Sequence, residues 1–393
     1  MANYREKEIH INGGGIAGLT AALALSQHGF KIVLNEQSAH FAEVGAGITV
    51  GPNASRVLLA LGLGDSLEQY VRTPRHGGVL HYQSGASLSR SEGGQKYLDD
   101  FGSPFWHIHR ADLLDVLLVA LQQQPGVELR TNHQLIDISQ SDTRVNCVFA
   151  NGSSSSCDLL IASDGIKSPI RQQLFSASPA EYTGYVAWRG LVDMKDLPGL
   201  ETDPDFALYV GPGKTVGRYQ VRRDSPQLNY AAFSTGEKWE EEGWSIRSEV
   251  EVLAEAFNDW HPDVQRIIEA TPSERCFKWA LHIREPLNSW VKGRVVLLGD
   301  AAHPMAPFLG LGAGIGIEDA MVLARSLSDT TDWQTALERY QKARIAHATK
   351  AQIASTEQGL HLLNAKASAG ENKRLYRDDT SSLYNYDATT VAI

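Results

Sequence analysis

Three glycines spaced as Gly13-x-Gly15-x-x-Gly18 follow a short apolar segment, residues 7–12, and precede a run rich in alanine and leucine. In a strand–turn–helix unit the first glycine permits the tight turn, the second lets a pyrophosphate approach the backbone, and the third lets the helix pack on the strand. About 20 residues further on, Glu36 ends a second apolar segment, where a carboxylate can accept hydrogen bonds from ribose hydroxyls. The pattern therefore predicts a dinucleotide site, and an acid there disfavours a ribose 2′-phosphate.

Two more aspartates stand where largely apolar runs end. Asp164-Gly165 and Gly299-Asp300 each follow residues that predict a buried strand. A carboxylate at the end of a strand can bind the hydroxyls of a flexible polyol. Asp300 is therefore a candidate for binding a polyol, and Asp164 stands at the C-terminal end of its own predicted strand, where Gly165 begins a turn into the next helix.

A second group of glycines, Gly310-x-Gly312-Ala313-Gly314, precedes a helix predicted over residues 315–327. The first N–H groups of a helix have no partner within the helix, and its dipole favours negative charge at that end. This loop therefore predicts a place where negative charge is stabilised.

The segments that must position these motifs are of two kinds. The opening strand, helix and strand form a βαβ unit, which predicts a parallel sheet. Residues 182–283 instead carry aromatic-rich, strand-like segments and predict a largely antiparallel sheet with helices on one side. Residues 333–367 contain no proline and predict one or two long helices, whereas the polar tail from Gly370 is expected to be loosely held.

The predicted fold class is α/β (α+β overall), a Rossmann-like dinucleotide-binding domain joined to a mostly antiparallel-sheet substrate domain and C-terminal helices. We predict that residues 1–180 and 284–345 form the first, discontinuous domain. Residues 181–283 form the substrate-binding domain, and residues 346–393 the C-terminal helix and tail.

Composition excludes several classes of function. The 393 residues contain 36 Lys and Arg against 46 Asp and Glu, and this net charge of -10 disfavours nucleic acid or an anionic membrane as a partner. No apolar run approaches the roughly 18 residues that a membrane span requires. A charged N-terminus and three cysteines without a CxxC pair predict a reduced, cytoplasmic protein with no metal site. We expect a monomer or a homodimer.

Together the motifs resemble the class A flavoprotein monooxygenases, the single-component aromatic hydroxylases that include salicylate hydroxylase and 3-hydroxybenzoate 6-hydroxylase. The resemblance covers residues 8–345. It depends on three motifs that occur in the family's order along the chain: the glycine fingerprint, Asp164-Gly165 and Gly299-Asp300. Residues 43–48 resemble the family's loop beside the isoalloxazine, and Arg110 resembles the arginine that contacts FAD. Residues 182–190 are similar to the segment that begins the substrate domain.

The resemblance implies FAD as the resident cofactor and NADH or NADPH as a transient cosubstrate. It also implies O2 and a flavin C4a-hydroperoxide that hydroxylates a phenolic or hydroxylated heteroaromatic small molecule. Glu36 would bind the adenosine ribose, Arg110 would lie near the pyrophosphate, and Asp300 would bind the ribityl chain. The cofactor-binding residues expected in full are Gly13, Gly15, Ile16, Ala17, Gly18, Glu36, Gly47, Ile48, Arg110, Asp164, Gly165, Asp300, Pro307, Gly310, Gly312, Ala313 and Gly314.

The catalytic candidates lie in the middle of the chain. We expect His282 to line the substrate cavity, Arg189 or Arg218 to bind a substrate carboxylate, and Tyr219 to form an aromatic wall. Tyr185, Tyr209 and Trp279 are further candidates for that wall. An ordinary ion pair explains each arginine, and core packing each aromatic ring, at least as well. His303 is expected to be structural, and the other histidines to lie at the surface or in turns.

Two residues depart from the family pattern. Leu311 stands where glutamine is usual, and Gln220 stands where salicylate-type members often have proline. We expect both to face the active site and to favour a substrate larger or more apolar than salicylate. The alternatives are a same-fold flavin monooxygenase or epoxidase of a larger non-aromatic or secondary-metabolite substrate, a flavin-free NAD(P)-dependent dehydrogenase, and a flavin-binding scaffold without turnover.

Overall fold

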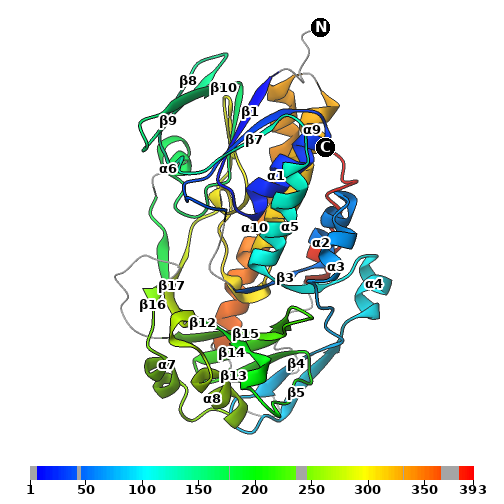
Figure 1. The fold of residues 1–393 in the computed structure, drawn as a ribbon, viewed down its shortest axis with the longest axis vertical. Coiled ribbons are helices and arrows are strands. Elements are labelled where there is room, and N and C mark those ends of the chain that lie inside the picture. Colours follow the sequence, from blue (N-terminus) through cyan, green and yellow to red (C-terminus); the bar gives the residue numbers. More distant parts are fainter. Residues whose placement is uncertain (1–6, 42–45, 177, 236–245, 331, 364–379) are drawn as a thin grey trace.

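The computed structural model describes residues 7–41, 46–176, 178–235, 246–330, 332–363 and 380–393. The molecule is elongated, and each of its two parts is built on a β-sheet (Figure 1). The upper part holds a six-stranded sheet whose neighbouring strands are parallel, except for the edge pair β18–β19. In sheet order its strands are β18 (Val291–Lys292), β19 (Val295–Leu297), β11 (Leu159–Ala162), β1 (Glu8–Asn12), β2 (Lys31–Asn35) and β7 (Val127–Arg130). This sheet confirms the predicted Rossmann-like domain.

The turn between β1 and helix α1 (Ile16–Gln27) depends on two glycines. Gly13 has a φ of 108°, which side-chain-bearing residues rarely adopt, and its N–H donates to the Asn35 carbonyl at the end of β2. A Cβ added to Gly18 would collide with the Gly13 carbonyl and the Ser163 hydroxyl. Both glycines are therefore needed for the close approach of helix and sheet.

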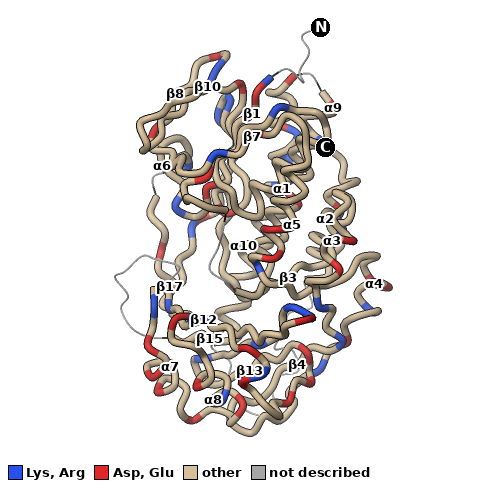
Figure 2. Tube along the Cα trace, in the orientation of Figure 1, with Lys and Arg blue, Asp and Glu red and all other residues tan. Residues whose placement is uncertain are grey.

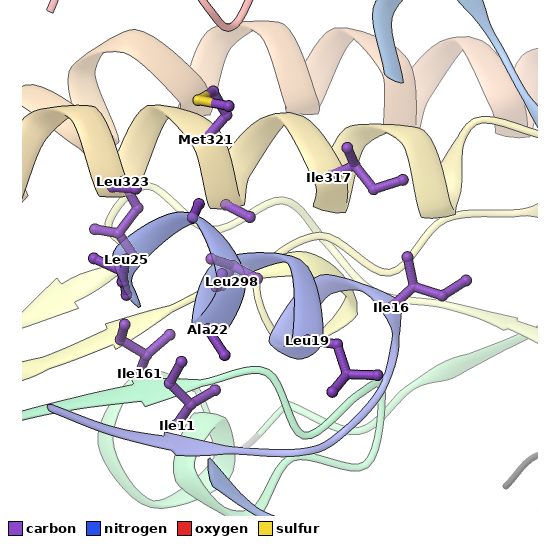
Figure 3. Packing of buried hydrophobic residues seen from close by; sticks show 14 of the residues in the cluster. Ile11, Ile16, Leu19, Ala22, Leu25, Ile161, Leu298, Ile317, Met321 and Leu323 are labelled. Carbon is purple, nitrogen blue, oxygen red and sulfur yellow. The ribbon is translucent and has the colours of Figure 1, made fainter. Parts of the chain in front are cut away.

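Helix α1 is enclosed between the parallel sheet and helix α9 (Gly312–Asp329), as Figure 3 shows. Ile11 and Ile161 contact it from the sheet, and Ile317 and Met321 lie on its α9 side. Full burial of an isoleucine side chain contributes roughly 1.5–3 kcal/mol. This packing fixes the glycine turn relative to the start of α9.

The lower part holds an eight-stranded, largely antiparallel sheet. In sheet order its strands are β16 (Ile246–Arg247), β17 (Phe277–Ile283), β12 (Glu181–Asp193), β15 (Gln227–Thr235), β14 (Lys214–Val221), β13 (Phe206–Gly211), β4 (His76–His81) and β5 (Ser87–Glu92). Helices α7 (Val250–Ala256) and α8 (Pro262–Glu269) cover its outer face (Figure 1). The predicted antiparallel sheet with helices on one side is confirmed.

Two strands of this sheet come from a distant part of the sequence. Strands β4 and β5 lie within residues 76–92, and β4 pairs in parallel with β13. The domain limits placed from the sequence stay a prediction. They assign residues 76–92 to the first domain, although strands β4 and β5 belong to the eight-stranded sheet. Helix α10 (Trp333–Leu363) runs unbroken through the limit placed at residue 345 (Figure 1).

Shorter elements complete the fold. A three-stranded sheet contains β8 (Leu135–Gln140), β9 (Val145–Phe149) and β10 (Ser154–Cys157), and a two-stranded one contains β3 (Gly47–Val50) and β6 (Trp106–His109). The remaining α-helices of the described residues are α2 (Pro52–Ala60), α3 (Gly64–Glu68), α4 (Gln95–Phe101), α5 (Arg110–Gln122), α6 (Pro169–Leu174) and α11 (Thr380–Tyr384).

The expectation of a loosely held tail is wrong for residues 380–393. Leu383 is buried, and the Tyr384 ring packs edge-on against Phe101 with centroids 5.5 Å apart. Apolar side chains at regular positions thus anchor the C-terminus on the upper part of the molecule. Residues 370–379 of that tail lie outside the described residues.

Charged residues of both signs are interspersed over the two parts of the molecule (Figure 2). The net charge of -10 therefore does not arise from one acidic segment. Within the described ranges, no helix combines the length and the apolar character that a bilayer crossing demands.

A buried ion network joins α10 to α9. Arg344 lies with Nη2 2.6 Å from a Glu318 carboxylate oxygen and donates from Nε to Asp319 at 2.8 Å. All three side chains are fully buried. A buried charge without its partner is strongly destabilising, so the network should matter for stability.

Replacing Arg344 with leucine should lower the free energy of unfolding by about 3–5 kcal/mol, because two buried carboxylates lose their cation. The control is Arg339→Leu on the same helix, which removes an exposed pair with Asp329 and should change stability by at most about 1 kcal/mol. Urea denaturation followed by tryptophan fluorescence measures both. Equal losses in the two variants would contradict this account.

Candidate active site

A cavity of about 1230 Å³ lies between the parallel sheet and the inner face of the eight-stranded sheet. It exceeds the roughly 300–1,000 Å³ typical of a pocket for one small ligand, so it can hold a cofactor and a substrate together. The predicted cofactor-binding residues that line it are Gly13, Gly15, Ile16, Ala17, Glu36, Gly47, Ile48, Arg110, Asp164, Gly165, Asp300, Pro307, Gly310, Gly312 and Ala313. Gly18 and Gly314 lie behind its wall, packed against neighbouring segments.

The glycine turn and Glu36 form one end of the cavity. A Cβ added to Gly15, the N-cap of α1, would meet nothing within 4 Å, so the cavity reaches the backbone at the start of the helix. The Glu36 carboxylate accepts hydrogen bonds from the N–H groups of Gly14 at 2.7 Å and Ser38 at 2.8 Å. An open helix start can bind phosphate, and an oriented carboxylate beside it can bind a ribose.

Charged groups line the middle of the cavity. Asp164 accepts a hydrogen bond from the Asn12 amide at 3.2 Å, and burial raises the pKa of Asp164 to about 6. Asp300 is exposed to the cavity, and desolvation by the surrounding protein raises the pKa of Asp300. Burial lowers the pKa of Arg110, and the charge of Asp300 partly opposes that change. Polar ligand groups that hydrogen-bond here would replace lost hydration.

The second glycine loop closes another side of the cavity. Gly310 has a φ of 65°, and its carbonyl accepts a hydrogen bond from the Thr49 hydroxyl at 2.9 Å. This bond fixes the loop on β3, while α9 starts at Gly312 on the cavity wall. The unpaired N–H groups and dipole of this 18-residue helix favour an anionic group at its N-terminus.

Residues 47 and 48 belong to the segment that resembles the loop beside the isoalloxazine. The Gly47 N–H donates a hydrogen bond to Asn229 Oδ1 at 2.7 Å, which ties β3 to the eight-stranded sheet. Asn229 also lines the cavity, and the sequence analysis missed it because its strand carries no motif. Residues 43–45 of the same segment lie outside the described residues.

Arg189 stands at the end of the cavity formed by the eight-stranded sheet. Its guanidinium lies over the rings of Phe277 and Trp279, 5.6 and 5.5 Å from their centroids. Burial, and then the nearby charge of Arg110, lower the pKa of Arg189 to about 10, so it stays a cation at neutral pH. A half-buried cation beside aromatic rings suits the carboxylate of an aromatic acid.

Tyr219 lies in the same region against His107, with ring centroids 4.2 Å apart. Burial raises the pKa of Tyr219, and burial lowers the pKa of His107 to about 3, so both rings are neutral at pH 7. A neutral imidazole can accept a hydrogen bond from a substrate hydroxyl. The expectation that such histidines lie at the surface or in turns is wrong for His107, since all four residues of β6 are buried.

The alternation of side chains along β14 explains why two expected residues do not line the cavity. Tyr219 faces the cavity, so its neighbours Arg218 and Gln220 face the opposite side of the sheet. There Arg218 is buried and donates to the carbonyls of Glu201 at 3.0 Å and Pro204 at 3.1 Å. The expectation that Gln220 faces the active site is therefore corrected, and the structure does not bring Arg218 to the site.

His282 and Leu311 also lie away from the cavity. Trp279 lines the cavity, and His282 is an odd number of positions further along β17, so its side chain lies on the opposite face of the sheet. Its ring centroid lies 5.7 Å from that of Tyr182. Leu311 is 3% exposed and packs in the hydrophobic core behind the glycine loop. The two departures from the family pattern, Leu311 and Gln220, therefore do not favour a substrate larger or more apolar than salicylate. Of the further wall candidates, Trp279 lines the cavity and Tyr185 and Tyr209 do not.

Comparison with known proteins decides the family. The family described as FAD binding domain matches residues 6–355. The 3-amino-4-hydroxybenzoate 2-monooxygenase of Streptomyces platensis is 34% identical over 100% of this chain and 98% of its own. This chain belongs to the class A flavoprotein aromatic hydroxylases. The 6-hydroxynicotinate 3-monooxygenase of Bordetella bronchiseptica is also 34% identical, over 88% of this chain and 90% of its own. A salicylate hydroxylase in a substrate complex is similar with a TM-score of 0.81 and 26% identity, over 98% of this chain and 96% of that one.

FAD is the cofactor of this family, and the cavity contains groups that suit it. The open helix start at Gly15 suits a pyrophosphate, and the oriented Glu36 carboxylate suits a ribose. The N-terminus of α9 suits an electron-rich ring system that becomes negatively charged on reduction. The flavin-free dehydrogenase alternative is excluded by this family membership.

Replacing Glu36 with arginine should weaken FAD retention by about 10- to 100-fold, because the lost carboxylate bonds are worth roughly 1.5–3 kcal/mol. The ratio of flavin to protein after gel filtration, and FAD titration of the apoprotein, measure this. Glu128→Arg on the adjacent strand β7 reverses the charge of an exposed residue outside the cavity and should leave flavin content unchanged. Full flavin content in Glu36→Arg would refute the assignment of Glu36.

Proposed function

We propose that this protein hydroxylates an aromatic or heteroaromatic acid that carries a ring hydroxyl, using FAD, NADH or NADPH, and O2. The observation that carries the proposal is Arg189, a half-buried cation beside aromatic rings in the same cavity as the cofactor residues. The carboxylate is the new element, since family membership alone supports a phenolic or hydroxylated ring.

FAD would lie along the residues of the parallel-sheet part of the cavity. Glu36 would bind the adenosine ribose, the turn from Gly13 to Ala17 and Arg110 would contact the pyrophosphate, and Asp300 would bind the ribityl chain. When bound, FAD accepts a hydride from NAD(P)H and activates O2 for transfer to the substrate. The N-terminus of α9 would stabilise the negative charge of the reduced cofactor.

The substrate would bind with its carboxylate at Arg189. The relatives named 3-amino-4-hydroxybenzoate 2-monooxygenase and 6-hydroxynicotinate 3-monooxygenase each act, by name, on a ring with a hydroxyl and a carboxylate. A charge-assisted bond between a carboxylate and a guanidinium is strong and geometrically specific. Both observations support the same substrate class for this chain.

His107 would accept a hydrogen bond from the ring hydroxyl and Tyr219 would orient the ring. His107 is a neutral imidazole at pH 7, so it polarises the hydroxyl without adding charge to the site. Phe233, Phe308 and Trp279 supply apolar wall that excludes water from the reacting ring.

The two sheets divide these tasks between them. Residues 1–180 and 284–345 would hold FAD, and residues 181–283, with the strands of residues 76–92, would surround the substrate. Three buried free cysteines suit a reducing compartment, so we expect a cytoplasmic enzyme, as a monomer or a homodimer.

The function is tested with purified holoenzyme by NADH and NADPH oxidation, O2 uptake and product analysis. The panel pairs salicylate, 3-hydroxybenzoate and 6-hydroxynicotinate with phenol and hydroxypyridine, which lack the carboxylate. We expect at least one acid to give hydroxylated product with little hydrogen peroxide. Its turnover should be faster than that of the matched ring without a carboxylate. Flavin-bound protein that consumes no NAD(P)H with any ring would instead indicate a scaffold without turnover.

Arg189→Leu should raise KM for the accepted acid by about 10- to 100-fold, since a bond to a charged group contributes roughly 1.5–3 kcal/mol. Arg189→Lys keeps the charge and should recover part of the affinity, and turnover of carboxylate-free rings should change little in either variant. Steady-state kinetics on the paired panel measures this. An equal effect on acids and carboxylate-free rings would refute carboxylate recognition.

A further inference from the structure

The fold brings together three potential metal ligands that the cavity does not use. His10 of β1, Cys147 of β9 and Cys157 of β10 are fully buried, and their ligand atoms all lie within 4.8 Å of one another. None of them lines the cavity. The sequence predicts no metal site because these residues come from distant segments without ligand spacing, and only the packing of β9 and β10 beside β1 makes the cluster.

Strand register places the two thiols on one face. Cys147 pairs with Ser155 and Cys157 pairs with Val145, so the cysteines occupy diagonal positions of the β9–β10 hairpin. Diagonal neighbours of an antiparallel pair point to the same side of the sheet. The Cys147 thiol is within hydrogen-bonding reach of both Cys157 and His10.

A carboxylate fixes the orientation of the imidazole. His10 Nε2 donates to Glu8 Oε1 at 2.7 Å, because an ionised carboxylate can only accept. With the ring proton on Nε2, the free lone pair is on Nδ1, which lies 3.3 Å from the Ser155 hydroxyl, on the hairpin side that bears the thiols. A carboxylate that holds the remote nitrogen of a ligating histidine is a usual outer-shell feature of a protein metal site.

We propose that His10 Nδ1 and the thiolates of Cys147 and Cys157 bind one thiophilic d10 cation, Zn²⁺ or Cu⁺. Two sulfurs and one imidazole exclude Mg²⁺ and Ca²⁺, which prefer oxygen. A tetrahedral Zn²⁺ site would take a fourth ligand in addition to these three, whereas Cu⁺ needs only the three. The cation would fasten the β9–β10 hairpin to β1, the strand that leads into the Gly13 turn.

The test uses FAD-loaded holoenzyme under reducing, anaerobic conditions, with Zn²⁺ in one arm and Cu⁺ in the other. Metal is added to the purified protein and also during expression, because the ligands are buried. We expect one bound cation per chain after gel filtration and a melting temperature that rises with metal concentration. Absence of bound metal by both routes would overturn the proposal.

Serine variants assign the ligands. Cys147→Ser and Cys157→Ser should each weaken binding at least tenfold, while Cys276→Ser removes the third buried thiol, outside the cluster, and should bind as the wild type does. Equal binding in all variants would overturn the assignment.

X-ray absorption of the metal-loaded wild-type protein gives a readout that does not depend on variants folding. The Zn²⁺ arm should show two sulfurs at about 2.3 Å and nitrogen at about 2.0–2.1 Å. A shell of only nitrogen and oxygen would overturn the proposal. So would a Cys147–Cys157 disulfide found by mass spectrometry of the protein as purified, because both thiolates would then be consumed.

Discussion

Asp319 and Arg344 make the buried contact on which the geometry of the site depends. Asp319 is held from three sides: by Arg344, by His303 at 2.5 Å and by the Gly299 N–H at 3.1 Å. Burial raises the pKa of this carboxyl, but the His303 and Arg344 charges and hydrogen bonds outweigh burial and lower the pKa of Asp319 to about 2. The carboxylate therefore stays ionised, and its hydrogen bond from Gly299 holds the turn in which Asp300 lines the cavity. A second carboxylate, Glu318, shares Arg344 and extends the network to Asn53 of α2.

The cavity lies where the parallel sheet and the largely antiparallel sheet come together, and glycines allow the close contacts between the two parts. Glycine permits backbone to approach a ligand or another strand, and at Gly47 any Cβ would overlap Asn229 and Tyr219 of the eight-stranded sheet. The Asn229–Gly47 bond and the Thr49–Gly310 bond then tie the two parts together around the space. The substrate end is thus positioned by the same strand, β3, that carries predicted FAD contacts.

The motifs could be predicted from sequence because each is local. The turn at Gly13, the strand before Asp164 and the helix after Gly310 depend on neighbouring residues, and the structure has all three. The side of a sheet on which a side chain lies, and the pairing of strands from distant segments, could not be predicted in the same way. A one-residue difference along β14 separates Tyr219 in the cavity from Arg218 behind it, and composition does not reveal which is which. Strands β4 and β5, His107 and the buried end of the chain are set by long-range contacts that no motif marks.

Two arginines line a cavity whose walls also carry carboxyl groups. The chain has a net charge of -10, and four acidic residues line the cavity: Glu36, Glu92, Asp164 and Asp300. Arg110 and Arg189 line it as well, and burial lowers the pKa of each guanidinium. Their mutual repulsion is weakly screened there, because the effective dielectric constant inside a protein is far below that of water. An anion that binds beside both guanidinium groups reduces this repulsion. The net negative charge of the chain does not cancel the effect, because salt screens charges beyond about 8 Å. Selection of an anionic cofactor and an anionic substrate can therefore occur in a strongly acidic protein.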